Sequence, residues 1–112
     1  MKHVARMTNT MLVTWDSWVY LQNKMHEERS VTGKPLSEKS IARLRRGFEV
    51  SSRNGWRQIC DYDFGGCNGS PVNAWEERRW TSWSVEDMAR ILDDAGLPHK
   101  ESDPIEVIDV YF

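Results

Sequence analysis

Two aspartates separated by one residue are the first place in this chain where side chains could bind a metal ion. Asp61 and Asp63 flank Tyr62 in a D-x-D pattern, and carboxylate oxygens are the ligands that Ca²⁺ and Mg²⁺ prefer. Two carboxylates do not complete a site, and no third ligand follows at a telling spacing. Because aspartates two apart also occur by chance, we expect no metal site here.

The cysteines and histidines are residue types that could act as a nucleophile and a base, but their spacing does not pair them. Cys60 could be paired with His3, His26 or His99, but no spacing in the sequence brings any of these imidazoles to the thiol. Cys60 and Cys67 lack both the C-x-x-C spacing and the second pair of ligands that zinc requires. In a reducing compartment we expect two thiols rather than a disulfide.

A glycine-rich stretch over residues 65–70 is the last candidate for chemistry. It matches neither the G-x-G-x-x-G pattern of dinucleotide sites nor a P-loop, which needs a lysine after its last glycine. With no catalytic pattern in the chain, we expect a protein that is not an enzyme and that has no cofactor.

A row of basic residues is a candidate binding surface. Lys39, Arg43 and Arg46 recur at spacings of four and three, which places them on one face of a helix, and Arg45 lies nearby. We call Lys39, Arg43 and Arg46 the basic stripe. Aligned cations suit the phosphates of a nucleic acid or an acidic groove of a protein, and the alternative is an ordinary solvated helix face. The preceding loop, 30–36, is too long for a helix-turn-helix motif, which disfavours DNA reading.

A second candidate surface joins acidic and aromatic residues. Asp93 and Asp94 fall in the last turn of a predicted helix, where the helix dipole disfavours negative charge by about 0.3–1 kcal/mol each. A local rule broken without visible compensation is typical of a functional position, although such charges also keep a protein soluble. Trp75, Trp80 and Trp83 lie upstream, and tryptophan is frequent at binding hot spots as well as in cores. We expect at least one of the three to be exposed.

The charge of the chain is segregated between its halves. Residues 1–57 hold eleven Lys and Arg against five Asp and Glu, and residues 58–112 hold four against twelve, within a total of −2. Segregation of this kind indicates either two faces that hold each other or a surface for a charged partner. A homodimer, with the basic face of one copy on the acidic face of another, is a third arrangement.

Length and composition indicate one domain over residues 1–112. A chain of this length can bury one core and is too short for two ordinary domains. Six tryptophans are many for such a core, so one or two should lie at the surface. Near the N-terminus only residues 11–13 are consecutively apolar, far short of a signal peptide or a membrane span. We expect a cytoplasmic protein that does not contact membranes.

Three helices are predicted from apolar periodicity and capping residues. The first runs from about Thr10 to Glu28, and the second from Ser37 to about Gly47. The third, Ser84 to Ala95, is the most clearly marked, because Ser84 opens an S-x-x-D capping pattern and Gly96 follows as a helix stop.

Strands are predicted between and after these helices: a hairpin from alternating polar and apolar residues, a stretch with no clean period, and a terminal strand from its β-branched and aromatic residues. Phe48 to Phe64 reads as a hairpin around Asn54-Gly55, Val72 to Trp83 as a third strand, and Ile105 to Phe112 as a terminal strand. The predicted order α-α-β-β-β-α-β gives an α+β domain. Two N-terminal helices, a C-terminal helix and a terminal strand pack with a small, mostly antiparallel sheet.

These features favour a small, non-enzymatic binding protein. We expect it to attach to a larger protein or nucleoprotein complex and to modulate it through charged surface and exposed aromatic residues. A phage-encoded or mobile-element inhibitor of a host defence complex would show the same features. The alternative is a nucleic-acid-binding regulator that uses the basic helix 37–47, although a total charge of −2 disfavours non-specific affinity of the whole domain.

Overall fold

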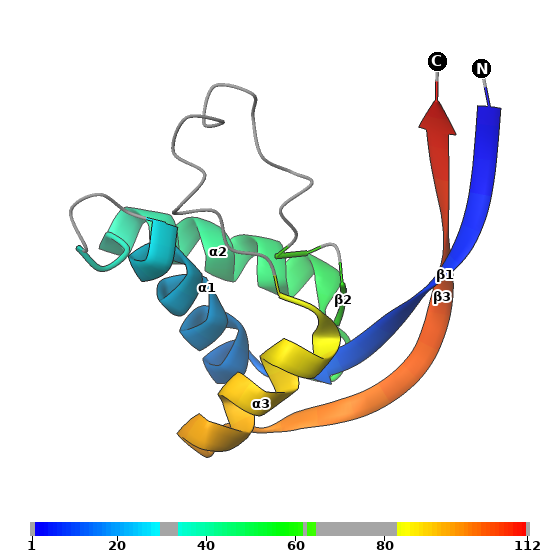
Figure 1. Cartoon of the computed structure of the whole chain (residues 1–112). Helices are drawn as coiled ribbons and strands as arrows, with labels where there is room; N and C mark the ends of the chain where they lie inside the picture. Colours follow the sequence, from blue (N-terminus) through cyan, green and yellow to red (C-terminus); the bar gives the residue numbers. More distant parts are fainter. Residues whose placement is uncertain (1, 30–33, 62, 65–82, 112) are drawn as a thin grey trace.

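The computed structural model describes residues 2–29, 34–61, 63–64 and 83–111. In this part of the chain, three helices and three strands follow in the order β1, α1, α2, β2, α3, β3. The strands form an antiparallel sheet in the order β2-β1-β3, and the helices gather at one end of it (Figure 1). The predicted α+β class is confirmed.

The central strand, β1 (Lys2–Val13), is the element that the sequence did not predict. It pairs with β3 along most of its length and with β2 only over residues 10–13. The prediction of a helix from Thr10 is therefore wrong for residues 10–13. A short apolar run fits a buried strand as well as a buried helix, and here the pairing with two other strands decides.

The first helix, α1 (Trp15–Arg29), confirms the remainder of that prediction. Thr14 begins it: the backbone N–H of Trp18 donates to the Thr14 carbonyl at 2.9 Å, and that of Ser17 to the Thr14 hydroxyl at 3.4 Å. One face of α1 is buried in the core, through Trp18, Leu21 and Met25.

The second helix, α2 (Glu38–Ser51), begins where it was predicted and ends later. Ser37 is its N-cap and accepts a hydrogen bond of 3.2 Å from the Ser40 N–H. Phe48, which was predicted to open a hairpin, lies in the helix and is 3 % exposed, because it continues the buried face of α2. The alternation at this point was too short to outweigh helical continuity.

The turn predicted at Asn54-Gly55 is confirmed. Both residues have positive φ angles, 54° and 81°, and Arg53 and Trp56 exchange backbone hydrogen bonds of 2.8 and 2.9 Å across the turn. The strand that follows, β2 (Arg57–Cys60), pairs with β1 and not with the end of α2. The predicted hairpin is therefore reduced to its turn.

The third helix, α3 (Val85–Ala95), confirms the prediction made from its caps. Ser84 and Asp87 form a capping box, and Gly96 ends the helix in the left-handed conformation at φ 70°. The strand predicted over Val72 to Trp83 lies outside the described residues, apart from Trp83 itself.

The last strand, β3 (His99–Tyr111), starts earlier than the predicted Ile105 and forms one edge of the sheet. Pro104 is tolerated there because an edge strand need not donate all its N–H groups to a neighbour. The register shifts beside it, between the pairs Thr8↔Ile105 and Thr10↔Ser102, which indicates a bulge.

The helix-covered end of the sheet holds the core, and the other end projects as an arm. The core residues of the described part are Met11, Val13, Trp18, Leu21, Met25, Phe48, Ile59, Phe64, Trp83, Met88 and Leu92. Residues 2–8 and 105–111 extend away from the helices, with the two chain ends side by side at the tip (Figure 1). The radius of gyration, 15.0 Å, accordingly exceeds the value of about 13 Å typical of a compact domain of this size. No helix in the described ranges is both long and apolar enough to cross a membrane.

Candidate functional site

The basic stripe lies on the solvent-exposed side of α2. Lys39, Arg43 and Arg46 are all exposed, opposite the buried Phe48. With 3.6 residues per turn, the three positions fall within about 60° of one another around the helix. Val50 lies in the same sector and is 89 % exposed. An apolar side chain therefore stands at the C-terminal end of the basic stripe.

Arg45 lies apart from the basic stripe and has internal partners. Its Nε atom is 3.0 Å from Oε1 of Glu49, and its guanidinium carbon is 5.0 Å from the centre of the Trp15 ring. Trp15 in turn packs edge-on against Phe48, with 5.6 Å between ring centres. Arg45 thus connects α2 with α1, and the structure does not group it with the other three cations.

The cations of the basic stripe have no ion-pair partner among the described residues. The ion pairs formed within these residues join Arg45 to Glu49 and Arg90 to Asp87, and Asp93 also contacts the His99 ring. Since the described acidic residues leave the stripe unneutralised, its positive potential is available to an anion from outside.

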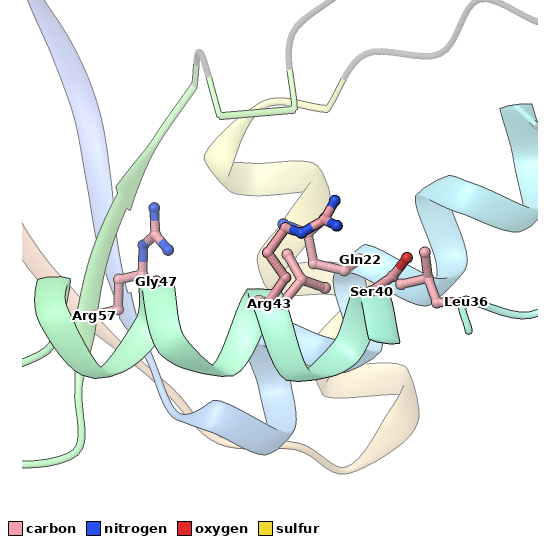
Figure 2. A pocket seen from close by; sticks show the side chains of 7 residues that line it. Gln22, Leu36, Ser40, Arg43, Gly47 and Arg57 are labelled. Atoms are coloured by element: carbon pink, nitrogen blue, oxygen red, sulfur yellow. The ribbon is translucent and has the colours of Figure 1, made fainter. Parts of the chain in front are cut away.

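A pocket of about 260 Å³ opens along one flank of the basic stripe, between α1, α2 and β2 (Figure 2). We call it the α2 pocket. It is lined by Gln22, Leu36, Ser40, Arg43, Leu44, Gly47 and Arg57. The guanidinium groups of Arg43 and Arg57 stand on the same side of α2 in Figure 2. Two positive charges therefore flank one hollow.

Arg57 was missed by the sequence analysis, because strand pairing brings it to the pocket. It pairs with Val13 of β1 and so lies on the helix-facing side of the sheet. Its guanidinium carbon is 4.2 Å from the centre of the Trp18 ring, a cation–π contact that contributes about 0.5–2 kcal/mol and holds the side chain. Arg57 and Ile59 are two residues apart in a strand and therefore share one face, and this spacing was the one sequence signal that pointed to the helix-facing side.

Trp83 belongs to the core and not to an exposed aromatic surface. It is 7 % exposed, and its ring centre lies 5.5 Å from that of Phe64. The backbone N–H of Trp83 donates to the backbone carbonyl of Phe64 at 3.1 Å. Trp75 and Trp80 lie outside the described residues. The described part of the chain therefore adds no exposed tryptophan to the predicted acidic and aromatic surface.

The two aspartates of that surface are at the far end of α3 from Trp83. Both Asp93 and Asp94 are exposed, in the last turn of the helix. Asp93 is engaged, since its Oδ1 lies 2.6 Å from Nε2 of His99. The structure does not bring these aspartates together with Trp83 into one site.

The D-x-D aspartates hold backbone groups. Asp61 Oδ1 accepts a hydrogen bond of 2.8 Å from the N–H of Val85, and Asp63 Oδ2 accepts one of 2.7 Å from the N–H of Cys60. Within the described ranges, no three or more His, Cys, Asp and Glu residues come together in a way that could hold a metal ion. Cys67 and the glycines around it lie outside the described residues.

A larger hollow, of about 970 Å³, lies between the turn after α2 and the start of β3. Its wall includes Arg53 and Lys100 as well as Glu101 and Asp103. The Nζ atom of Lys100 lies over the Trp56 ring, 4.1 Å from its centre. Because both signs of charge line this hollow, it selects no one class of charged ligand. The α2 pocket has the more definite chemistry.

Comparison with known proteins adds no relative: no protein-family model, curated protein or solved structure matches this chain. The basic stripe, Arg57 and the exposed Val50 are the residues that the structure brings to one side of the molecule.

Proposed function

We propose that the protein is a non-enzymatic binding module, which attaches to a larger protein or nucleoprotein complex and modulates it through the basic stripe. One observation carries the proposal. Lys39, Arg43 and Arg46 are exposed and meet no carboxylate of the described residues, although the chain has more acidic than basic residues. An acidic patch on a partner would be attracted to this face over about 8–10 Å at physiological salt.

Apolar groups beside the basic stripe favour a protein partner. Val50 is 89 % exposed at one end of the stripe, and Leu36 and Leu44 line the α2 pocket on its flank. Such groups are stabilised by burial against the side chains of another protein, and a phosphate backbone offers them little. The alternative function, a nucleic-acid-binding regulator, relies on the cations alone.

The test is affinity capture from cells of the native host with the wild type and a charge-reversed variant, Lys39→Glu/Arg43→Glu/Arg46→Glu. We expect the wild type to recover a stoichiometric protein complex that dissociates near 1 M salt, where the Debye length is about 3 Å. The variant should lose that complex at an unchanged melting temperature, because the three side chains are exposed. Undiminished recovery by the variant would contradict the proposal.

A matched control reverses acidic residues on the other half of the chain. The variant Asp94→Lys/Glu101→Lys/Glu106→Lys also changes three exposed charges and should retain the partner. Recovery of nucleic acid alone by the wild type would favour the alternative function. If sedimentation shows a dimer of the purified chain that both variants disrupt, the homodimer of basic and acidic faces is supported instead.

The identity of the recovered complex decides the narrower role. A cytoplasmic defence complex of the host, inhibited when the module is bound, would support the expectation of a phage or mobile-element inhibitor. Inhibition is measured as the activity of the captured complex with and without added wild-type module, with the charge-reversed variant as the inactive control.

A further inference from the structure

The polar groups that line the α2 pocket are mainly hydrogen-bond donors. Arg43 and Arg57 contribute guanidinium groups, which donate and do not accept. The Ser40 hydroxyl accepts a hydrogen bond of 3.0 Å from the Ser37 hydroxyl, so its own hydrogen can serve another acceptor. Gln22 adds an amide that donates through its NH₂ group. A group that fits this lining must supply acceptors, and two guanidinium groups favour a negatively charged one.

The rest of the lining is apolar and leaves space. Leu36 and Leu44 are half-buried, and Gly47 contributes no side chain. Apart from Gly47, its two neighbours in the chain and the adjacent backbone of α2, no atom of the described residues lies within 4 Å of the position that a Cβ atom would take at Gly47. The pocket therefore combines a cationic side with a leucine-lined side and with open space above the helix.

The size and rigidity of the α2 pocket suit one side chain of a partner. Its volume of about 260 Å³ is below the range of about 300–1,000 Å³ typical of small-molecule sites. Two helices and a strand supply most of its wall, and Arg57 is stacked on Trp18. Binding would thus require little ordering of the protein, which lowers its entropic cost.

We propose that the α2 pocket binds one carboxylate side chain of the partner protein, a Glu or Asp that stands beside an aliphatic residue. The carboxylate accepts hydrogen bonds from Arg43 and Arg57, and the aliphatic group packs on Leu36 and Leu44. This inference rests on the proposed function and names the group that is recognised. A phosphate would satisfy the two arginines but would leave the leucines unused, which is why we favour a peptide.

Two short peptides test the chemistry of the pocket directly. Acetyl-Leu-Glu-Leu-amide and acetyl-Leu-Gln-Leu-amide are titrated into ¹⁵N-labelled protein, with inorganic phosphate as a third probe. We expect the Glu peptide to shift the amide signals of Ser40, Gly47 and Arg57 with a Kd of about 1 mM, as suits a single anchor residue. The Gln peptide, which has the same shape without the charge, should bind at least about tenfold more weakly. Equal binding of the two peptides, or tighter binding of phosphate, overturns the inference.

Gly47 allows the pocket to be filled without loss of the fold. In Gly47→Leu the new side chain occupies the open space, and leucine has a higher helix propensity than glycine. We expect this variant to denature at higher urea concentration than the wild type and to bind the Glu peptide at least about tenfold more weakly. Gly47→Ala is the matched control, which should gain stability as well and bind within about twofold of the wild type. A Gly47→Leu variant that binds like the wild type contradicts the proposed site.

The two proposals fail in different ways. If neither peptide shifts the pocket amides while the charge-reversed stripe still loses its partner, the carboxylate pocket is wrong and the binding module stands. If the Glu peptide binds but charge reversal leaves partner capture intact, the pocket is real and the basic stripe is not the docking surface.

Discussion

The imidazole of His99 lies against the carboxylate of Asp93, with Nε2 of the one 2.6 Å from Oδ1 of the other. This contact ties the first residue of β3 to the last turn of α3, a turn that contains no basic residue of its own. The unfavourable position of Asp93 at the negative end of the helix dipole is therefore compensated from outside the helix. From the sequence alone Asp93 and Asp94 are equally uncompensated, and the structure separates them.

Neutralising these two aspartates should have opposite consequences. In Asp94→Asn a negative charge leaves the helix C-terminus without loss of any hydrogen bond of the described residues, so the free energy of unfolding should rise by about 0.3–1 kcal/mol. Asp93→Asn loses the carboxylate that contacts Nε2 of His99, and stability should not rise. Urea denaturation of both variants in one buffer measures the difference. Equal stabilisation by both substitutions would contradict a compensating role for His99.

Truncation of Leu92 should strongly destabilise the domain. Its side chain is 0 % exposed in the core beneath α3, and Leu→Ala at such a site costs about 2–5 kcal/mol in the free energy of unfolding. Val50→Ala is the control, because Val50 lies in a helix and is 89 % exposed. The control should change stability by less than about 0.5 kcal/mol. Similar urea midpoints for both variants would show that α3 does not pack as described.

The parts of the fold that the sequence predicted are those that local interactions determine. The two ends of α3 follow from Ser84, Asp87 and Gly96, each of which lies within one helical turn of the end that it determines. The turn at Asn54-Gly55 follows from the ability of those two residues to adopt positive φ. In each case the residues that carry the signal are neighbours in the chain.

The central strand could not be predicted in this way. Lys2 pairs with Tyr111 and Val13 with His99, so the β3 partners of residues 2–13 lie near the other end of the chain. In the candidate site, too, local spacing predicts some residues and long-range pairing determines the others. The spacing of residues on α2 was enough to find the basic stripe, but Arg57 joins Arg43 only through the pairing of β2 with β1.

The capping box of α3 should make stability depend on pH in the acidic range. Hydrogen bonds from the backbone N–H and then the hydroxyl of Ser84 lower the pKa of Asp87, and the charge of Arg90 acts in the same direction. Because the pKa of Asp87 is lower in the folded state, the ionised carboxylate stabilises the fold above the usual aspartate pKa of about 3.9. This contribution is lost as the pH falls from there through the folded-state pKa.

Two variants separate the parts of this cap. Ser84→Ala removes the side-chain acceptor for the Asp87 N–H and should cost about 1 kcal/mol near pH 7. Asp87→Asn should be less stable than the wild type at pH 7, with a difference in urea midpoint that shrinks as the pH falls below about 3.9. A difference that stays constant from neutral to acidic pH would mean that the ionised Asp87 does not stabilise the cap.

Hydrogen exchange should divide β1 into two parts. Residues 10–13 lie between β2 and β3, so their amides should exchange only on extensive unfolding. Residues 2–8 pair with β3 alone among the described strands, and a two-stranded ribbon is marginally stable in water. We expect those amides to exchange faster, with every second one, directed at the open edge, least protected. Dilution provides the control: strong protection along the whole arm that disappears at low protein concentration would mean that a second copy pairs with its edge.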